Sequence, residues 1–401
     1  MGSYLPDFLD TDASGRLYLH TSVHQVGMRK GCVLANLEMV IDGDGHIFED
    51  VEGLRKHLKS PMKDANITKL MGIFPQLDHL HHSLAQNPED SFGVSKGIFK
   101  DPGVAGWGDF MNKAGIDSAV LFPTQGLSYG KIIDADFAIG ACQAYNDWLT
   151  DAYTQKDKRL HGVALIPMQE PEAAVEELRR AVVDLGMCSA MLPSTGLPTH
   201  LGSKIYWPVY AEAERLGVSL TVHGGAHHDL GMNTLNVFAA THAIGHPMGI
   251  MIGMAGMLFN GVFERFPKLN VGFLEGGVGW FLMALERFSG SYHAFTPYDP
   301  RDEMLKLPEG KSVGDYLIDL CKQGRVRVGV EGDEAALAYA VHVAGPEAFM
   351  YSSDFPHEVN LGSIRHEIEE LIEVDDLTAE EKEAILWKNS LEFYGLTPVA
   401  I

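Results

Sequence analysis

Two stretches of the chain, SLTVHGG (Ser219–Gly225) and NVGFLEGG (Asn270–Gly277), share one design. Each is a short run of apolar and β-branched residues, typical of a buried parallel strand, that ends in a histidine or an acid and two glycines. Between them lies an apolar stretch, Ala239–Phe263, that is interrupted by His242, His246 and several glycines. These interruptions favour a buried helix over a membrane span. Strand, helix and strand in this order predict one β/α unit of a parallel sheet.

The same unit repeats from about residue 37 onward. The predicted strands are Leu37–Asp42, Ser118–Phe122, Gly162–Ile166, Ser189–Leu192, Ser219–His223, Asn270–Glu275, Arg325–Val330 and Phe349–Ser353. Helical patterns separate them, at Ala135–Tyr153, Pro171–Leu185, Trp207–Leu216 and Val278–Phe288. About eight repeats of this unit predict an α/β fold, a (β/α)8 TIM barrel. An open doubly wound sheet is the alternative, but no GxGxxG turn follows the first strand.

Several regions lie outside this repeat. Residues 1–36 are predicted to be an N-terminal extension, and residues 37–401 a single barrel domain. The barrel carries one long insertion after strand one, at about residues 47–110, and a second at about residues 291–324. An amphipathic helix is expected to close the chain at Leu377–Tyr394. No linker of altered composition marks a second domain.

Composition narrows the classes of partner. The 401 residues are 46% hydrophobic and 21% charged, as in ordinary soluble globular proteins. A net charge of -23 repels nucleic-acid phosphates and anionic lipid, so neither nucleic acid nor membrane is an expected partner. Four widely spaced cysteines and the lack of a visible secretory signal indicate a cytoplasmic protein with reduced thiols. The stretch Met248–Met257 is either a homodimer face or a buried barrel helix.

Four of the predicted strands end in acids and histidines. Barrel enzymes place their chemistry at the C-terminal ends of the strands, so we expect these side chains to meet. Taken singly, each has a structural explanation as a core histidine or a helix cap, but together they favour a metal centre. Imidazole and carboxylate ligands suit Zn, Fe, Mn or Co. The residues concerned are Asp44 and His46 directly after strand one, His223 on strand five, Glu275 on strand six, and Asp354 after strand eight. Asp354 and Glu275 are also expected to be catalytic, and His357 is expected to orient the catalytic site.

Four segments carry a family resemblance: IDGDGHIFED (Ile41–Asp50), LTVHGG, NGVFERFPKLNVGFLEGGVGWF (Asn260–Phe281) and YSSDFPHE. They resemble the amidohydrolase superfamily, and within it the branch related to aminocarboxymuconate semialdehyde decarboxylase. The resemblance implies a metal-binding barrel that spans roughly residues 37–395. It implies that Asp44 and His46 replace the family's H-x-H pair and that His223 is the strand-five ligand. Asp354 would then be the strand-eight aspartate, which binds metal and transfers a proton.

The chain departs from the family pattern at two positions. Asp44 stands where the family has a histidine, and Glu275 stands where many relatives carry a catalytic histidine. Asp44, Glu275 and Asp354 bring three negative charges into one cavity, which one divalent ion would leave net negative. Two ions with a bridging hydroxide would neutralise them. A binuclear centre, with Glu275 as a ligand or base, therefore stands beside a mononuclear one in which Glu275 is protonated or paired with a cation.

Other residues are candidates for substrate binding. His79 and His82 lie in the insertion after strand one, which is expected to rise over the barrel mouth. Trp280 follows the Glu-Gly-Gly motif, and His246 lies in the apolar helix. A solvated loop explains the first two residues equally, and simple packing explains Trp280.

The motifs leave three functions open. A metal-activated water, with its pKa lowered to about 7, can hydrolyse an ester, amide, lactone or thioester of a small organic acid. The Glu275 substitution and the oxygen-rich ligand set favour this hydrolase hypothesis. The first alternative is the non-oxidative decarboxylation of an aromatic or unsaturated acid, towards which the family resemblance points. The second is an inactive binding barrel. Either enzyme would hold one or two divalent ions (Zn, Fe or Mn) and act on a small molecule.

Overall fold

The computed structural model describes residues 38–64, 72–78, 101–227, 229–301, 304–357 and 359–398, and two short strands before them. The chain divides into two compact units, residues 1–37 and residues 38–401. In the first unit, β1 (Leu9–Thr11) and β2 (Leu17–Leu19) pair antiparallel.

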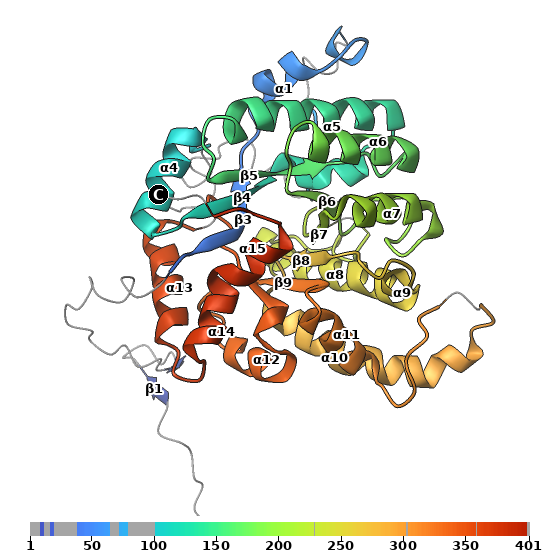
Figure 1. Ribbon diagram of the computed structural model, residues 1–401, viewed down its shortest axis with the longest axis vertical. Helices are drawn as coiled ribbons and strands as arrows, with labels where there is room; N and C mark the ends of the chain where they lie inside the picture. The colour runs from blue at the N-terminus through green and yellow to red at the C-terminus, as the bar shows by residue number, and fades with distance from the viewer. Residues whose placement is uncertain are drawn as a thin grey trace, which may run out of the picture. The chain divides into compact units, whose positions relative to one another are not determined.

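The second unit contains one sheet of eight parallel strands, in which each strand pairs with the next one in sequence. Figure 1 shows these strands at the centre of the unit with helices around them. The predicted (β/α)8 barrel is therefore confirmed. The strands are β3 (Ile41–Ile47), β4 (Ser118–Pro123), β5 (Leu160–Leu165), β6 (Ser189–Pro193), β7 (Ser219–His223), β8 (Val271–Leu274), β9 (Val326–Val330) and β10 (Phe349–Tyr351).

A helix follows each strand, and shorter helices fill the connections. The helices after successive strands are α4 (Gly103–Ala114), α5 (Ala135–Leu149), α6 (Pro171–Val183), α7 (Trp207–Leu216), α8 (Phe238–Phe259), α10 (Gly277–Phe295), α12 (Leu337–Ala344) and α13 (Leu361–Glu373). The others are α1 (Val51–His57), α9 (Val262–Arg265), α11 (Val313–Lys322), α14 (Ala379–Glu383) and α15 (Asn389–Phe393). Short 3-10 and π turns are η2 (Met62–Asp64), η3 (Gln125–Lys131), η4 (Thr150–Thr154), η5 (Lys204–Tyr206), η6 (Thr296–Tyr298), η7 (Pro346–Ala348) and η8 (Ala384–Lys388).

Hydrogen bonds between β3 and the segment after β10 join the first and last strands. The Ser353 N–H and hydroxyl donate to the two carboxylate oxygens of Asp42, at 2.9 and 2.6 Å. The N–H of Asp354 donates to the carbonyl of Asp44 at 3.0 Å. These bonds hold the Asp354 backbone against the strand that carries Asp44, which brings two of the predicted metal ligands together.

The first strand begins later than the sequence predicted. The apolar run Leu37–Asp42 was expected to be the strand, but β3 spans Ile41–Ile47, so Asp44 and His46 lie inside it. Its pairing with β4 shifts register between Asp42 and Gly45. The acids, glycines and histidine of β3 are all buried. Hydrophobic periodicity cannot reveal a strand whose buried face is polar.

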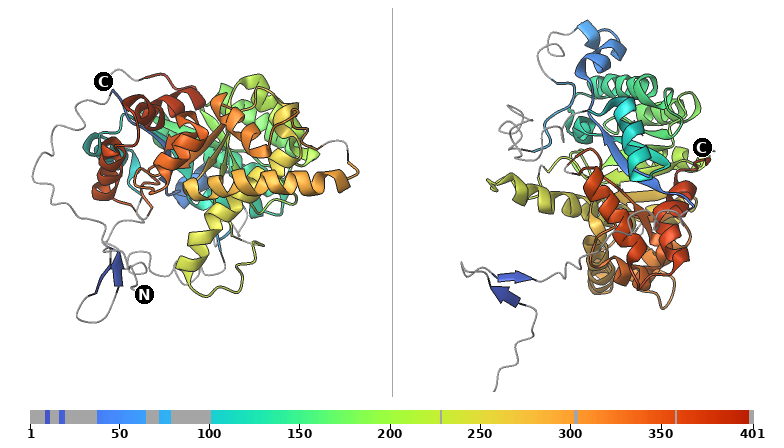
Figure 2. Two further views of the ribbon diagram at one scale, coloured as in Figure 1. Left: turned by 90° about the horizontal axis from the view of Figure 1, so that it is seen from below. Right: turned by 90° about the vertical axis from the view of Figure 1, so that its left-hand side faces the viewer.

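Helix α8 was predicted to be buried, but it is buried on one face only. Its inner face packs against β7, and Gly253 lies close to the side chain of Val222. Its outer face exposes Ile244, Met248 and Ile252. Among the described residues, α8 is the one helix whose length and composition would suit a membrane span. Figure 2 shows α8, in yellow, extending away from the barrel strands at one end. Whether this face binds a second copy stays a prediction.

Candidate metal centre

Three fully buried side chains form the inner group of the site: Asp44 and His46 from β3, and His223 from the end of β7. The Asp44 Oδ1 atom lies 3.6 Å from His46 Nε2 and 3.3 Å from His223 Nε2. Each residue offers one ligand atom to the same small volume, within 4.8 Å of the others. In the described part of the chain, His46 Nε2 and Asp44 Oδ2 have no hydrogen-bond partner. The inner group therefore has the donor atoms of a metal site.

The hydrogen bonds of the Nδ1 atoms of the two histidines determine whether their Nε2 atoms carry a hydrogen. His46 Nδ1 lies 2.8 Å from the carbonyl oxygen of Pro123, and His223 Nδ1 lies 2.8 Å from that of Gly224. A carbonyl oxygen only accepts, so each Nδ1 must carry the hydrogen. In the neutral ring, Nε2 then points a lone pair towards Asp44. This arrangement, in which the second nitrogen donates to a backbone carbonyl, is typical of histidines that bind metals.

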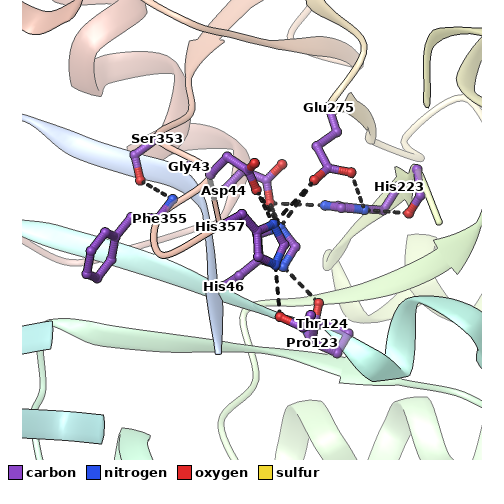
Figure 3. A network of polar contacts seen from close by, with 12 residues as sticks. Gly43, Asp44, His46, Pro123, Thr124, His223, Glu275, Ser353, Phe355 and His357 are labelled. Carbon is purple, nitrogen blue, oxygen red and sulfur yellow. Dashed lines mark hydrogen bonds and ion pairs between the residues drawn. The ribbon is translucent and has the colours of Figure 1, made fainter. Parts of the chain in front are cut away.

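Four more side chains, the outer group, adjoin the inner one; three of them are partly exposed, and His357 is buried. Asp354 Oδ1 lies 3.4 Å from His46 Nε2 and 2.7 Å from His357 Nδ1. Glu275 Oε1 lies 3.7 Å from His46 Nε2, and Figure 3 shows Glu275 facing the two histidines. The side chains of the outer group are 10–22% exposed, against 0–1% for the inner group. The site is therefore open on their side. The outer group comprises Glu275, Asp354, His357 and His246.

Two of the outer residues have unusual backbones. Glu275 follows β8 with φ 61°, and Asp354 lies after β10 with φ 54°. Side chains other than glycine rarely adopt this left-handed region, and strain of this kind gathers at functional sites. Besides Asp229, these are the non-glycine residues with positive φ in the described part of the chain. The two carboxylates at the barrel mouth therefore occupy their places at a conformational cost.

Burial and neighbouring charges shift the pKa values of the two inner histidines in opposite directions. Burial, together with the neighbouring His357 and His223, holds the pKa of His46 well below its usual value. Burial alone would lower the pKa of His223, but the carboxylates of Glu275 and Asp44 raise it to about 10. The inner group therefore favours a cation beside His223, a role that a proton or a metal ion can fill.

Glu275 has a close imidazole partner that comes from a different element. His246 Nδ1, on α8, lies 2.7 Å from Glu275 Oε2. Burial opposes ionisation of Glu275, but His246 and other imidazoles outweigh it and hold the pKa of Glu275 well below the usual range. Gly224 makes room for this pair, since a Cβ there would lie 2.9 Å from both partners. The rings of His227 and His242 lie 4.9 and 4.7 Å from that of His246.

The remaining predicted substrate-binding residues are not at the cluster or are not described. The Trp280 ring is buried and packs against Phe273 and Phe281, so these contacts place it in the core. His79 and His82 lie outside the residues that the structure describes. Substrate binding by these three residues stays a prediction.

Part of the insertion after β3 does reach the loops at the barrel mouth. The Pro75 carbonyl accepts a hydrogen bond from the Ser128 hydroxyl, on the 3-10 turn after β4, at 2.5 Å. The Leu77 carbonyl accepts one from the N–H of His227, in the loop after β7, at 3.1 Å. Residues 72–78 therefore lie where an insertion that shapes substrate binding is expected.

Two residues that contact the cluster or its neighbours, Asp42 and Thr124, were not predicted from the sequence. Asp42 bonds Ser353, and burial raises its pKa to about 6. Thr124, directly after β4, contacts His357 Nε2 at 2.9 Å. The repeated acids of DGDGH offered a signal for Asp42. Thr124 had none, because its importance depends on a residue 233 positions away.

Comparisons with known proteins identify the sequences that this chain resembles. The amidohydrolase family model matches residues 77–396. The 2-amino-3-carboxymuconate-6-semialdehyde decarboxylase of Dictyostelium discoideum is 27% identical over 295 residues, which cover 72% of this chain and 75% of the relative. The gamma-resorcylate decarboxylase of a Polaromonas species is 22% identical over 301 residues, which cover 71% and 85%.

Solved structures share the fold. The 5-carboxyvanillate decarboxylase of Novosphingobium aromaticivorans, with bound manganese and 3-methoxy-4-hydroxy-5-nitrobenzoic acid, has a TM-score of 0.68 at 18% identity over 89% of this chain and 97% of its own. A dihydroxybenzoic acid decarboxylase from Polaromonas, with manganese and the inhibitor 2-nitroresorcinol, has a TM-score of 0.62 at 17% identity, over 89% and 97%. The family match spans most of the barrel and all of the strands after β3, and this chain is a member of the amidohydrolase family.

Proposed function

We propose that this protein is a divalent-metal-dependent, non-oxidative decarboxylase of a small aromatic or unsaturated carboxylic acid. The observation that carries the proposal is the division of the site. Three fully buried donors face a partly exposed set of acids and imidazoles at one end of a barrel. The relatives reported above support the choice of reaction, because they are named as decarboxylases of such acids.

The inner group and Asp354 would hold the ion. Their imidazole and carboxylate donors suit manganese and similar divalent ions. We favour one ion over two, because the charge of Glu275 is already compensated by His246. When bound, a divalent ion supplies Lewis-acid polarisation of the substrate's oxygen atoms.

The outer group would carry out the proton chemistry. The bond from the ring or chain carbon to the carboxylate breaks, its electron pair stays on that carbon, and carbon dioxide leaves. A proton must then reach the carbon, and the close contact between Asp354 Oδ1 and His357 Nδ1 can hold one at that place. Because these side chains are partly exposed, the substrate would approach from their side of the site.

Hydrolysis is the second candidate, and it was the reading that the sequence alone favoured. The observation behind it is Glu275, which stands where many relatives carry a catalytic histidine and which can accept a proton from water. The structure weakens this argument, because His246 restores an imidazole beside the position of the missing one. The named relatives add further support for decarboxylation.

A paired assay tests the proposal. The purified protein is freed of metal with a chelator, loaded with Mn2+, and given 2,6-dihydroxybenzoate, 5-carboxyvanillate and related acids while carbon dioxide release is recorded. The methyl esters of the same acids form the hydrolysis panel. Metal-dependent carbon dioxide release from at least one acid is expected. Ester cleavage without carbon dioxide release from any acid would favour the hydrolase instead.

A further inference from the structure

Thr124 connects His357, a residue of the outer group, to strand β3. Its hydroxyl oxygen lies 2.9 Å from His357 Nε2 and donates its hydrogen to the carbonyl of Ile47, on β3, at 2.7 Å. The preceding residue, Pro123, provides the carbonyl that accepts from His46 Nδ1. Figure 3 shows both imidazoles joined to this Pro123–Thr124 step.

The number of hydrogens on these atoms determines the direction of the bonds. A threonine hydroxyl carries one hydrogen, and the Ile47 carbonyl can only accept it. The Thr124 oxygen must therefore accept from His357, so His357 Nε2 carries a hydrogen. The other nitrogen, Nδ1, is then the one that faces Asp354 Oδ1, at 2.7 Å.

We propose that Thr124 is a positioning residue that fixes the ring orientation of His357 and keeps a hydrogen on its Nε2 atom. The rings of His357 and His46 lie side by side, with centroids 4.1 Å apart and planes tilted by 31°. His46 turns Nε2 towards the donor cluster, whereas His357 turns Nδ1 towards Asp354. The end of one strand, β4, therefore determines which nitrogen atom of His46 and of His357 faces the cluster, although both histidines belong to other elements.

The position of Thr124 is itself held by a buried acid. The Glu49 carboxylate accepts hydrogen bonds from the N–H groups of Thr124, Gln125 and Gly126, at 3.3, 2.9 and 2.7 Å. Glu49 is 5% exposed, so this cap on the turn after β4 lies in the interior. A turn fixed by three hydrogen bonds to one buried carboxyl group gives Thr124 the rigidity that a positioning role requires.

The proposal depends on the proposed metal centre but not on the proposed reaction. Metal affinity and the histidine tautomer are therefore measured along with turnover. The variants are Thr124→Val, which keeps the shape but removes the hydroxyl, and Thr124→Ser, which keeps the hydroxyl. Thr150→Val is the matched control, because its buried hydroxyl also bonds a backbone carbonyl, that of Asn146 at 2.8 Å, far along α5.

Nitrogen NMR of protein with 15N-labelled histidine, metal-free and loaded with diamagnetic Zn2+, reads the tautomer directly, and His357→Gln assigns the signals. Wild type and Thr124→Ser should show a hydrogen on His357 Nε2, whereas Thr124→Val should show loss of that fixed form. Manganese affinity or turnover in Thr124→Val should fall on the order of 10–100-fold, as for other residues that orient a ligand, and recover in Thr124→Ser. Thr150→Val should leave both unchanged.

A wild-type His357 without a hydrogen on Nε2 would overturn the inference whether or not the variants fold. So would a Thr124→Val protein whose metal affinity, turnover and nitrogen signals match those of Thr150→Val. If wild type binds manganese but releases no carbon dioxide, the proposed reaction fails while this inference can still be tested through affinity and tautomer. If wild type binds no divalent ion, the metal centre fails, and this inference fails with it.

Discussion

The inner and outer groups of the site differ in exposure and in what holds them in place. Asp44, His46 and His223 are fully buried, lie on strands, and are fixed by backbone carbonyls behind the two histidines. The outer residues, all but His357 partly exposed, lie on strand-end loops or on α8 and mainly contact one another. Donor atoms need fixed geometry, whereas reacting groups need access to substrate. The difference supports the proposal that the inner group, with Asp354, binds the ion and that the other outer residues take part in the chemistry.

The largest effect is expected from breaking the inner group. Asp44→Asn removes a buried charge between two histidines, so manganese should no longer raise the melting temperature of the protein. At metal 100-fold above its dissociation constant, that stabilisation is worth about 2.7 kcal/mol in the wild type. Turnover should fall by more than the roughly 10–100-fold typical of an indirect contact. Thermal melts with and without Mn2+, beside turnover assays, measure both effects.

Asp117→Asn is the control for that variant. Asp117 lies just before β4 and accepts the N–H of Val40, at the opposite end of the strands from the cluster. The control should keep the full response to manganese. An Asp44→Asn protein that still melts later with manganese would remove Asp44 from the set of ligands.

Glu275→Gln should separate the two groups most clearly. The substitution keeps the shape but removes the charge that faces His246, so the manganese response should remain while turnover falls on the order of 10²–10⁴-fold. Glu334→Gln is a nearby control, because Glu334 accepts the N–H of Val278 and takes no part in the cluster. Full turnover in Glu275→Gln would show that the carboxylate has no role in the reaction.

A smaller effect is expected from crowding the outer group. In Gly224→Ala, the added methyl group would lie 2.9 Å from both Glu275 Oε2 and His246 Nδ1 and force the pair apart. We expect a loss of turnover of about tenfold, equivalent to roughly 1.4 kcal/mol, with metal binding retained. Gly279→Ala, where nothing lies within 4 Å of the new Cβ, should behave as wild type. Equal turnover in the two variants would contradict the importance of the pair.

The smallest effect lies outside both groups and concerns stability. Burial, with the nearby Glu331 and Asp333, raises the pKa of Glu367 on α13 to about 8. Between its ordinary pKa and this value, the unfolded chain has lost the proton that the folded protein keeps, so this residue makes stability fall as pH rises. The slope is at most about 1.4 kcal/mol per pH unit.

Glu367→Gln removes that contribution to the pH dependence. Denaturant unfolding at pH 5 and at pH 8 should therefore show the variant gaining stability relative to wild type at the higher pH. Glu176→Gln, on the exposed side of α6, is the control and should show no such gain. A pH-independent difference between Glu367→Gln and wild type would refute the assignment.

The sequence predicted the residues of both groups but not how the outer residues pair with one another. Strand ends such as VHGG and SDFPH mark His223 and Asp354, because a barrel brings the ends of its strands together whatever its loops do. The predicted start of β3 was wrong, because the buried residues of this strand are polar and its register with β4 shifts after Asp42. The pairing of His246 with Glu275 depends on how α8 packs, which no local pattern encodes. The role of Thr124 could not be predicted for the same reason, because its partner His357 is distant in the sequence.

The division between the groups is tested most directly by counting metal ions. Wild type, His223→Gln and Glu275→Gln are dialysed against excess Mn2+, and their metal content is measured by plasma mass spectrometry. One ion per chain is expected in wild type and in Glu275→Gln, and almost none in His223→Gln. Two ions in wild type that fall to one in Glu275→Gln would make Glu275 a ligand of a binuclear centre and rule out the proposed division of roles.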